Sequence, residues 1–249
     1  RSHEDLPRTR AIVETSETGE LPQITYLKMH RCEKCKELCE DLELKSRLQF
    51  NRYYKPEDFI EGDPHSPIWI IGINPAVKPD WKDQRSIDDL KNHFNNRGNI
   101  HPYFKDFDKV SHSLFKQLGA RGGVAHTDIV KCSSLSFPPS GIKGKSAGEI
   151  VNNCSGFLKL QIETLKPSML ICNGAIVCQY ILTILPPIVL NIKGEVQDNV
   201  KLTHYWSKLD GKPICIVLTG FIGRIDDYSK RRLGVEIENL ITELDIPWK

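Results

Sequence analysis

The sequence lacks several features that would assign it at once to a familiar class of protein. No apolar run approaches the roughly 20 residues that a membrane-spanning helix needs, so we expect no membrane partner. The N-terminal stretch has no apolar segment of the kind that a secretion signal carries. The formal net charge is only +2, which gives no overall electrostatic case for binding nucleic acid. A functional assignment must therefore come from local motifs.

What is present is typical of a folded domain. Hydrophobic residues make up 39% of the chain and charged residues 27%, so global disorder is not expected. We expect a polar leader over residues 1–25 and a single α/β domain over residues 26–249. Eight cysteines without a secretion signal favour a reducing compartment, where clustered thiols more often bind metals than pair as disulfides. The expected location is cytoplasmic, and nucleoid-associated if the source is bacterial or archaeal.

Four short apolar runs rich in β-branched residues predict strands, and helical patterns separate them. Continuous apolar character is typical of strands buried on both faces, as in a parallel sheet. The alternation predicts a three-layer α/β sandwich with a central, mainly parallel four-stranded sheet flanked by helices. In such sheets the ligand crevice lies at the carboxyl ends of the strands. The predicted strands are 67–74, 124–132, 167–174 and 213–220, and the predicted helices are 26–48, 108–119, 146–166, 175–185 and 228–244.

The cysteines are unevenly distributed. Cys32 and Cys35 form a C-x-x-C pair, which alone is compatible with zinc, a redox pair or no function. Cys132 ends the second predicted strand, and Cys154 lies in the helix that follows. Together the four thiolates suit a [4Fe–4S] cluster or tetrahedral zinc, because soft ligands select these centres. The cysteine positions alone fit equally well a metal site or small side chains that are simply buried.

The order of these motifs resembles the iron–sulfur uracil-DNA glycosylases, often called families four and five. The resemblance lies in "CEKC", "IIGINPA", "DIVKC" and "EIVNNCSGFLKLQIETLKPSMLICNGAIV", and it runs from roughly Tyr26 to Gly223. It implies a uracil-DNA glycosylase-like fold in a monomer that acts on DNA. It also implies a structural [4Fe–4S] cluster, with zinc as the alternative, and the implied ligands are Cys32, Cys35, Cys132 and Cys154.

The loop after the first predicted strand, "GINPA", occupies the place of the family's water-activating motif. In iron–sulfur members that motif usually reads Gly-Glu-Ala-Pro-Gly, whereas this loop is closer to the Gly-Ile-Asn-Pro of mismatch-specific and single-strand-selective glycosylases. By this match Asn74 holds the attacking water and Ile73 lines the base pocket. Asp80 is the alternative for a catalytic carboxylate. Asn74 is otherwise explained as a turn residue that is favoured before proline.

The second strand-end motif departs from the family. The iron–sulfur enzymes have Thr-Asn where this chain has Thr127-Asp128, and that asparagine amide reads the uracil edge in the relatives. A buried, protonated Asp128 could donate to N3 of cytosine and accept from N4. We therefore expect a cytosine-type substrate, and a modified one, since excision of ordinary cytosine would destroy the cell's own genome. Modified cytosine in phage DNA would make this a defence enzyme. In the alternative, Asp128 caps a loop and contacts no base.

An aromatic side chain stacks on the flipped base in the family. Counting back from Gly119 assigns this role to Tyr103, which follows a proline, with Phe104 beside it. Stacking of this kind contributes about 1–3 kcal/mol per base. The preceding stretch, 84–101, is longer than in the family and is read as a surface insertion or a reshaped pocket wall.

The last motif does not match. Relatives carry Thr-x-His-Pro-Ser after the fourth strand, with the histidine donating to the base, whereas this chain has no histidine in the corresponding residues 219–223. Arg224 is the nearest cation that could stabilise the leaving base. Phe221 or Ile222 could fill the gap in the base stack. His126 and His204 are possible substitutes for the missing histidine, although a single histidine is more often structural.

Lysines around "PPSGIKGK" are candidates for binding phosphates, namely Lys131, Lys143 and Lys145. The favoured interpretation is a DNA glycosylase that excises a modified cytosine. A uracil-DNA glycosylase of base excision repair, a degenerate relative that binds modified DNA without cutting it, and a metal-stabilised module that binds a small nucleotide are the alternatives.

Overall fold

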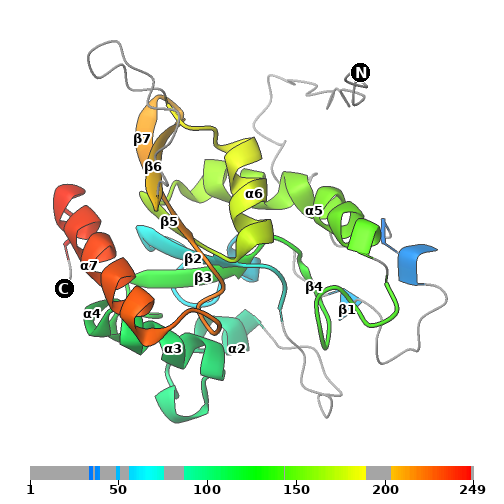
Figure 1. Ribbon diagram of the computed structural model, residues 1–249, viewed down its shortest axis with the longest axis horizontal. Coiled ribbons are helices and arrows are strands. Elements are labelled where there is room, and N and C mark those ends of the chain that lie inside the picture. Colours follow the sequence, from blue (N-terminus) through cyan, green and yellow to red (C-terminus); the bar gives the residue numbers. More distant parts are fainter. Residues whose placement is uncertain are drawn as a thin grey trace.

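The middle layer of the fold is a five-stranded sheet with strand order β3-β2-β5-β7-β6 (Figure 1). The computed structural model describes residues 34–35, 37–39, 49–50, 56–75, 87–142, 144–188 and 203–247. Four neighbouring strands of the sheet run parallel and correspond to the four predicted runs. The predicted fold class is confirmed. The parallel strands are β2 (Ile68–Gly72), β3 (Val124–Asp128), β5 (Met169–Asn173) and β7 (Lys212–Thr219).

The fifth strand, β6 (His204–Leu209), is not among the predicted strands and pairs antiparallel with β7 at the sheet edge. Asp210 and Gly211 connect the two strands, and both have positive φ, 49° and 75°. An Asp-Gly pair is the typical sequence of a two-residue hairpin that needs two left-handed residues. The stretch "KLDGKP" therefore carried a signal for this strand.

Helices cover both faces of the sheet (Figure 1). Helices α5 and α6 lie on one face, and α3, α4 and α7 lie on the other. A second, two-stranded antiparallel sheet pairs β1 with β4. The helices are α2 (Ile87–Lys91), α3 (Pro102–Val110), α4 (His112–Lys116), α5 (Gly144–Leu165), α6 (Ala175–Ile184) and α7 (Asp227–Glu243), with 3-10 helices η1 (Glu37–Cys39), η3 (Pro56–Phe59) and η4 (Arg97–Asn99) and short strands β1 (Gln49–Phe50) and β4 (Cys132–Ser133).

The core is divided in two by the central strands. Every residue of β2, β3 and β5 is buried, as expected for strands covered on both faces. Alternation along β2 sends Trp69 and Ile71 toward the α5 and α6 face, and Ile68 and Ile70 toward the α3 and α7 face. The sheet is thus held from both sides, which fixes the ends of its strands.

The predicted helix over 108–119 is in fact two helices. Ser111 interrupts it with an extended backbone (φ −153°, ψ 120°) between α3 and α4. The Ser111 hydroxyl accepts a hydrogen bond from the Leu114 backbone N–H at 3.0 Å and donates to Glu238 of α7 at 2.7 Å. A serine that caps a helix competes with continuation of the preceding one. Of the predicted helix over 26–48, only a turn at 34–35 and helix η1 lie in the described residues.

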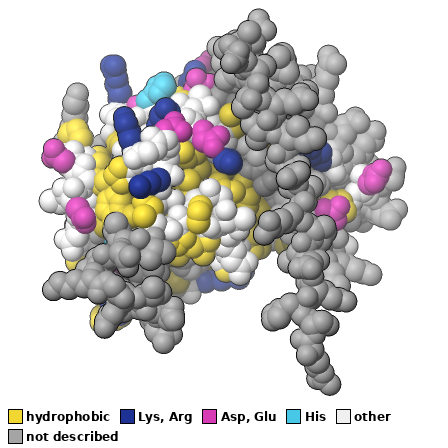
Figure 2. All heavy atoms as spheres, turned by 90° about the horizontal axis from the view of Figure 1, so that it is seen from above, with side chains coloured by type: hydrophobic (Ala, Val, Ile, Leu, Met, Phe, Trp, Pro, Cys, Tyr) yellow, Lys and Arg dark blue, Asp and Glu magenta, His cyan; other side chains and the backbone are white. Residues whose placement is uncertain are grey.

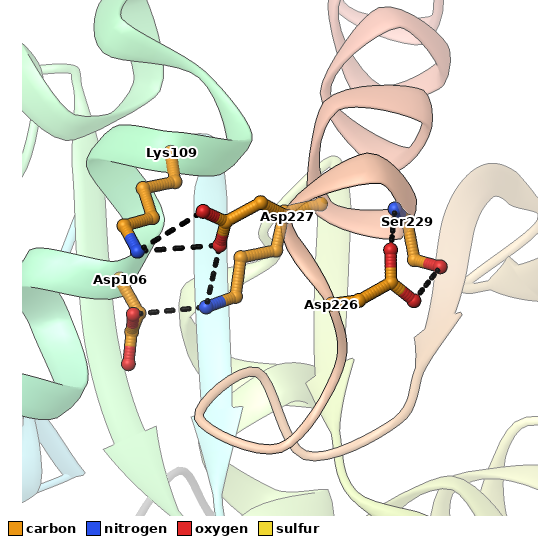
Figure 3. Close-up of polar contacts among 6 residues, drawn as sticks. Asp106, Lys109, Asp226, Asp227 and Ser229 are labelled. Atoms are coloured by element: carbon orange, nitrogen blue, oxygen red, sulfur yellow. Dashed lines mark hydrogen bonds and ion pairs between the residues drawn. The ribbon is translucent and has the colours of Figure 1, made fainter.

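Helix α7 is fixed to α3 by ion pairs (Figure 3). Lys230, whose side chain is 5% exposed, lies 2.9 Å from Asp106 of α3 and 3.7 Å from Asp227. Lys109 of α3 reaches Asp227 at 3.2 Å. Asp226 caps α7 by accepting hydrogen bonds from the Ser229 backbone N–H and hydroxyl, and these hold its pKa below the ordinary value. The ion pairs thus join the first turn of α7 to α3, the helix that carries Tyr103.

Among the residues that the structure describes, none of the helices combines the length and the apolar character needed to cross a membrane.

Candidate active site

The predicted site residues gather at the carboxyl ends of the parallel strands. Asn74 lies just after β2, Asp128 ends β3 and Asn173 ends β5, while the loop 220–226 follows β7. Backbone hydrogen bonds continue past the strands, from Val130 N–H to the Ile73 carbonyl at 2.9 Å. They hold the loops after β2 and β3 together. This is the edge at which α/β sheets bind their ligands.

Asp128 is a buried carboxyl group held above a glycine. It is 8% exposed and pairs across the strands with Gly72. A Cβ added to Gly72 would overlap Oδ1 of Asp128 and would lie 2.9 Å from Nε2 of His126. The absence of a side chain at position 72 therefore creates the space that both polar groups occupy.

His126 lies between two carboxyl groups. Its Nδ1 is 2.8 Å from Oε2 of Glu61, and its Nε2 is 3.8 Å from Oδ1 of Asp128. The backbones of Glu61 and His126 also exchange two hydrogen bonds, of 2.8 Å and 2.9 Å. Sequence reasoning named His126 only as a possible substitute and did not find Glu61. The His-x-Asp spacing on a strand does place both side chains on one face, which was a usable signal.

Two aromatic side chains of α3 cover this group. The Phe104 ring packs edge-on against His126, with ring centroids 4.9 Å apart, and Phe104 is 4% exposed. The Tyr103 ring stacks on Phe221 with centroids 6.0 Å and planes 17° apart. Phe104 therefore supports His126 from the core, and Tyr103 extends from the buried carboxylates toward the surface.

Burial and neighbouring side chains shift the pKa of Tyr103. Burial raises the pKa of the Tyr103 phenol well above its ordinary value, the negative charges of Asp128 and Glu61 raise it further, and the side chain of Asn173 opposes the shift. The phenol is thus neutral throughout the physiological range. Tyr103 provides a neutral aromatic surface next to Asp128.

Asn74 has its amide orientation fixed by neighbours. Its Nδ2 donates to the Ser134 hydroxyl at 2.7 Å and to the Pro75 carbonyl at 3.2 Å. Ser134 in turn donates to the Ser136 carbonyl at 2.6 Å. With both amide protons engaged, the Oδ1 of Asn74 is the group that can accept from a water molecule. Sequence reasoning identified Asn74 but not Ser134.

The loop after β7 presents one aromatic side chain and buries the next residue. Phe221 is 43% exposed, and the Arg224 guanidinium lies 5.7 Å from its ring centroid. Ile222 is 0% exposed, and its backbone N–H donates to Oδ1 of Asn173 at 2.8 Å. The prediction that Ile222 enters the base stack does not fit this burial, because the side chain is part of the core. Phe221 alone keeps that predicted role. Ile73 is partly buried against the α5 and α6 side of the core.

Three of the four predicted cluster ligands lie in or against one large hydrophobic cluster, the α5 and α6 half of the core. Cys35 and Cys132 pack against the same hydrophobic cluster that contains Cys154. Asn153, next to Cys154 on α5, places its Nδ2 3.5 Å from the Cys35 sulfur and donates to the Lys34 carbonyl at 3.2 Å. The N-terminal segment is thus attached to α5 where the thiols are. In the described part of the chain, however, no group of three His, Cys, Asp or Glu side chains is arranged to bind a metal. The four-thiolate cluster stays a prediction.

Lys131 connects the thiol region to Asp128. Its ammonium group is buried and donates to the Thr127 hydroxyl at 3.0 Å and to the backbone carbonyl of Asp128. Burial lowers the pKa of Lys131 to about 7, although the charges of Asp128 and Cys154 oppose this shift. Sequence reasoning treated this lysine as a phosphate contact, whereas its burial makes it a support for the end of β3.

Some predicted residues cannot be placed. Cys32, Asp80 and Lys143 lie outside the described residues, as does the expected leader over 1–25. Lys145 belongs to the first turn of α5, but its side chain is not described. The roles of these residues stay predictions.

His204, the other possible substitute for the missing histidine, lies on β6 and bonds Glu236 of α7 at 2.5 Å. It is four strand spacings from His126, or about 19 Å.

Charge on the visible surface is mixed. Figure 2 shows one face on which Lys and Arg side chains are interspersed with Asp and Glu around hydrophobic side chains. No broad area of one sign appears among the described residues of that face, which agrees with the small net charge.

Comparison with known proteins identifies one family. The family model described as uracil DNA glycosylase superfamily matches residues 59–219, well over half of the chain. The match includes Asn74, Asp128, Cys132 and Cys154. It ends at Thr219, so the loop that carries Phe221 lies beyond it. A search of curated proteins found no match.

Proposed function

The chain belongs to the uracil-DNA glycosylase superfamily, and from this membership and the geometry of the site we propose that it is a DNA glycosylase. It flips a nucleotide out of DNA and hydrolyses the bond between the base and its sugar, which leaves an abasic site. The excised base is a modified cytosine, and DNA that carries it is foreign to the cell. The enzyme would then act in defence against phage.

The buried carboxyl group of Asp128 is the observation that carries the choice of base. Cytosine offers an amino donor at N4 and a lone pair at N3. A protonated carboxyl group can donate to N3 and accept from N4, so it pairs with both positions. Asp128 is buried, with His126 between it and the carboxyl group of Glu61, and burial favours a protonated carboxyl group. A cytosine edge offers this group both a donor, at N4, and an acceptor, at N3.

The remaining residues supply the other requirements of excision. Tyr103 or the exposed Phe221 provides the aromatic face on which the flipped base stacks. Asn74 holds the attacking water through Oδ1, which its bond to Ser134 leaves available. An amide orients a water but is a poor base. The bond to the base should therefore be largely broken before the water adds.

Cys32, Cys35, Cys132 and Cys154 would hold a [4Fe–4S] cluster, with zinc as the alternative. The support is that Cys35 lies against Asn153, the neighbour of Cys154 on α5, and that Cys132 borders the same hydrophobic cluster as Cys154. The centre would fix that segment to the sheet. Hydrolysis of a glycosidic bond transfers no electron, so its role is structural.

A panel of oligonucleotides tests the substrate. Each duplex and each single strand carries uracil, cytosine, 5-methylcytosine, 5-hydroxymethylcytosine or a glucosylated 5-hydroxymethylcytosine, and mass spectrometry identifies the released bases. We expect release of a 5-modified cytosine. Release of uracil alone would contradict the proposal and identify a repair enzyme.

A second candidate is a relative that binds modified DNA without cutting it. The observation that favours it is the loop after β7, which has no histidine in residues 219–223 and lies beyond the family match. Binding of the panel without formation of abasic sites would support this candidate.

A further inference from the structure

The group Glu61–His126–Asp128 is more than a way to hold one carboxyl group. Its side chains are contiguous and nearly closed to solvent, with exposures of 10%, 6% and 9%. Two backbone hydrogen bonds fix Glu61 against His126, and the Phe104 ring covers the imidazole. A buried imidazole between two acids is an arrangement suited to hold and pass a proton.

The hydrogen bonds determine where the protons lie. An ionised Glu61 can only accept, so the Nδ1 of His126 carries a proton and donates it over 2.8 Å. The Nε2 of His126 then faces Oδ1 of Asp128 at 3.8 Å. Two carboxyl groups around one imidazole favour a second proton, which resides either on Nε2 or on Asp128. The three groups titrate together, and the second proton belongs to the pair His126–Asp128.

Among the surrounding groups, Lys131 also titrates near neutral pH, because burial lowers its pKa to about 7. From α3, Tyr103 contacts His126 with ring centroids 5.8 Å apart, and its raised pKa keeps it neutral. From the segment after α2, His93 is separated from His126 by the Phe104 ring. After β3, Lys131 bonds the backbone carbonyl of Asp128. On β2, Gly72 contributes no side chain.

We propose that Glu61, His126 and Asp128 form a proton relay that protonates N3 of the flipped cytosine while its glycosidic bond breaks, an inference that rests on the proposed function. The bond between C1′ and N1 breaks, and its electron pair moves into the base. Asp128 gives to N3 the one proton that it shares with Nε2 of His126, so the base leaves neutral, with hydrogen on N3. Water bonds to C1′ and releases one proton, and one proton from solvent restores the relay.

The relay would supply two things that this chain needs for excision. The relay neutralises the leaving base. The loop after β7 cannot take this role, because residues 219–223 include no histidine. The relay also discriminates between bases, because N3 of uracil already carries hydrogen and has no lone pair to receive the proton. The 3.8 Å separation must shorten when a base enters, as catalytic hydrogen bonds commonly do on substrate binding.

The test is single-turnover excision of 5-hydroxymethylcytosine between about pH 5.5 and about pH 9.5. The wild-type rate should fall about tenfold per pH unit on the alkaline side. Glu61→Gln should move this fall to lower pH, because His126 loses the negative charge that stabilises its protonated form. His126→Gln should lower the rate by about 10²–10⁴-fold, the usual contribution of a general acid. Affinity for the DNA should change little in either variant.

His204→Gln is the matched control. It removes the other His–Glu pair, at the opposite edge of the sheet, and should leave the pH profile unchanged. Thermal unfolding of each variant shows whether it is folded.

A substrate with carbon in place of N3, 3-deaza-5-hydroxymethylcytosine, tests the relay without any variant. We expect binding but no excision. Equal excision of the 3-deaza substrate, or a wild-type rate that does not change with pH, would overturn the relay and leave the proposed function standing. If no modified cytosine is released at any pH, the proposed function fails and the relay with it.

Discussion

Asp128 ends β3, and its neighbours differ from those of an exposed carboxylate. It is buried, it lies over a glycine, and an imidazole is 3.8 Å away. Gly72 is on β2 and His126 is on β3, the strand of Asp128 itself, and both constrain the carboxyl group. Small changes at these positions should therefore have large effects on excision.

Gly72→Ala is the smallest such change. The added Cβ would overlap Oδ1 of Asp128 and displace the carboxyl group from its position. We expect excision to fall by about 10²-fold, in line with the cost of a 1 Å misplacement. Single-turnover base release measures this loss. Gly148→Ala on α5 is the control, because an added Cβ there meets nothing within 4 Å, and a similar loss in this control would contradict the explanation.

Ser134→Ala tests the orientation of Asn74. Without the 2.7 Å bond to the Ser134 hydroxyl, the amide of Asn74 can rotate, and Oδ1 no longer faces the water position. We expect the rate of excision to fall about tenfold, equivalent to loss of one net hydrogen bond of about 1.4 kcal/mol, with DNA affinity unchanged. Ser134→Thr keeps the hydroxyl and should retain most of the rate. Weaker DNA binding with normal chemistry would assign Ser134 another role.

Sequence reasoning named candidates at the sequence motifs and missed the neighbours that contact them. Asn74, Tyr103 and Asp128 could be named as candidates because motif order and strand ends locate them. Glu61 precedes β2 and meets His126 through an isolated bridge between segments 65 residues apart. Ser134 reaches Asn74 across 60 residues. No periodicity or local pattern predicts such contacts.

At the scale of elements, the packing of α7 on α3 positions both aromatic sides of the site. Tyr103 comes from α3 and Phe221 from the loop that leads into α7, and the two rings stack. Lys230 is the buried centre of the ion pairs between these helices (Figure 3). The stacking of Tyr103 on Phe221 should therefore depend on Lys230.

Lys230→Met removes the buried charge and leaves Asp106 without its partner. We expect a loss of about 1–3 kcal/mol in the free energy of unfolding, less than for a fully buried ion pair because Asp106 is partly exposed. Denaturant unfolding measures it. Lys109→Met, at the exposed end of the same ion pairs, should have little effect. Equal losses in the two variants would show that burial is not the cause.

The elements themselves were largely predictable. Four apolar runs gave the four parallel strands, because burial on both faces requires continuous apolar sequence. Helix α3 could not be separated from α4, since the break depends on Ser111 bonding to Glu238 of a distant helix. Strand β6 had a recognisable turn in Asp210-Gly211, but its own alternating pattern is that of a partly exposed edge strand.

At the scale of the whole molecule, the predicted cluster would join the N-terminal segment to the domain. Cys154 lies on α5 beside Asn153, which contacts that segment. Cys154→Ser should release the iron, abolish visible absorption and lower the melting temperature. Iron analysis and absorbance measure the result. Cys178→Ser on α6, away from the predicted ligands, should keep the metal. Full iron content in the Cys154 variant would remove this cysteine from the ligand set.

The central claim is that the carboxyl group of Asp128 selects the base. One duplex that carries both a uracil and a 5-hydroxymethylcytosine, incubated with the wild-type protein and with Asp128→Asn, tests it directly by mass spectrometry of the released bases. We predict that the wild-type protein releases 5-hydroxymethylcytosine and that the variant, with its amide, releases uracil. Release of uracil by the wild-type protein, or an unchanged preference in the variant, would contradict the account.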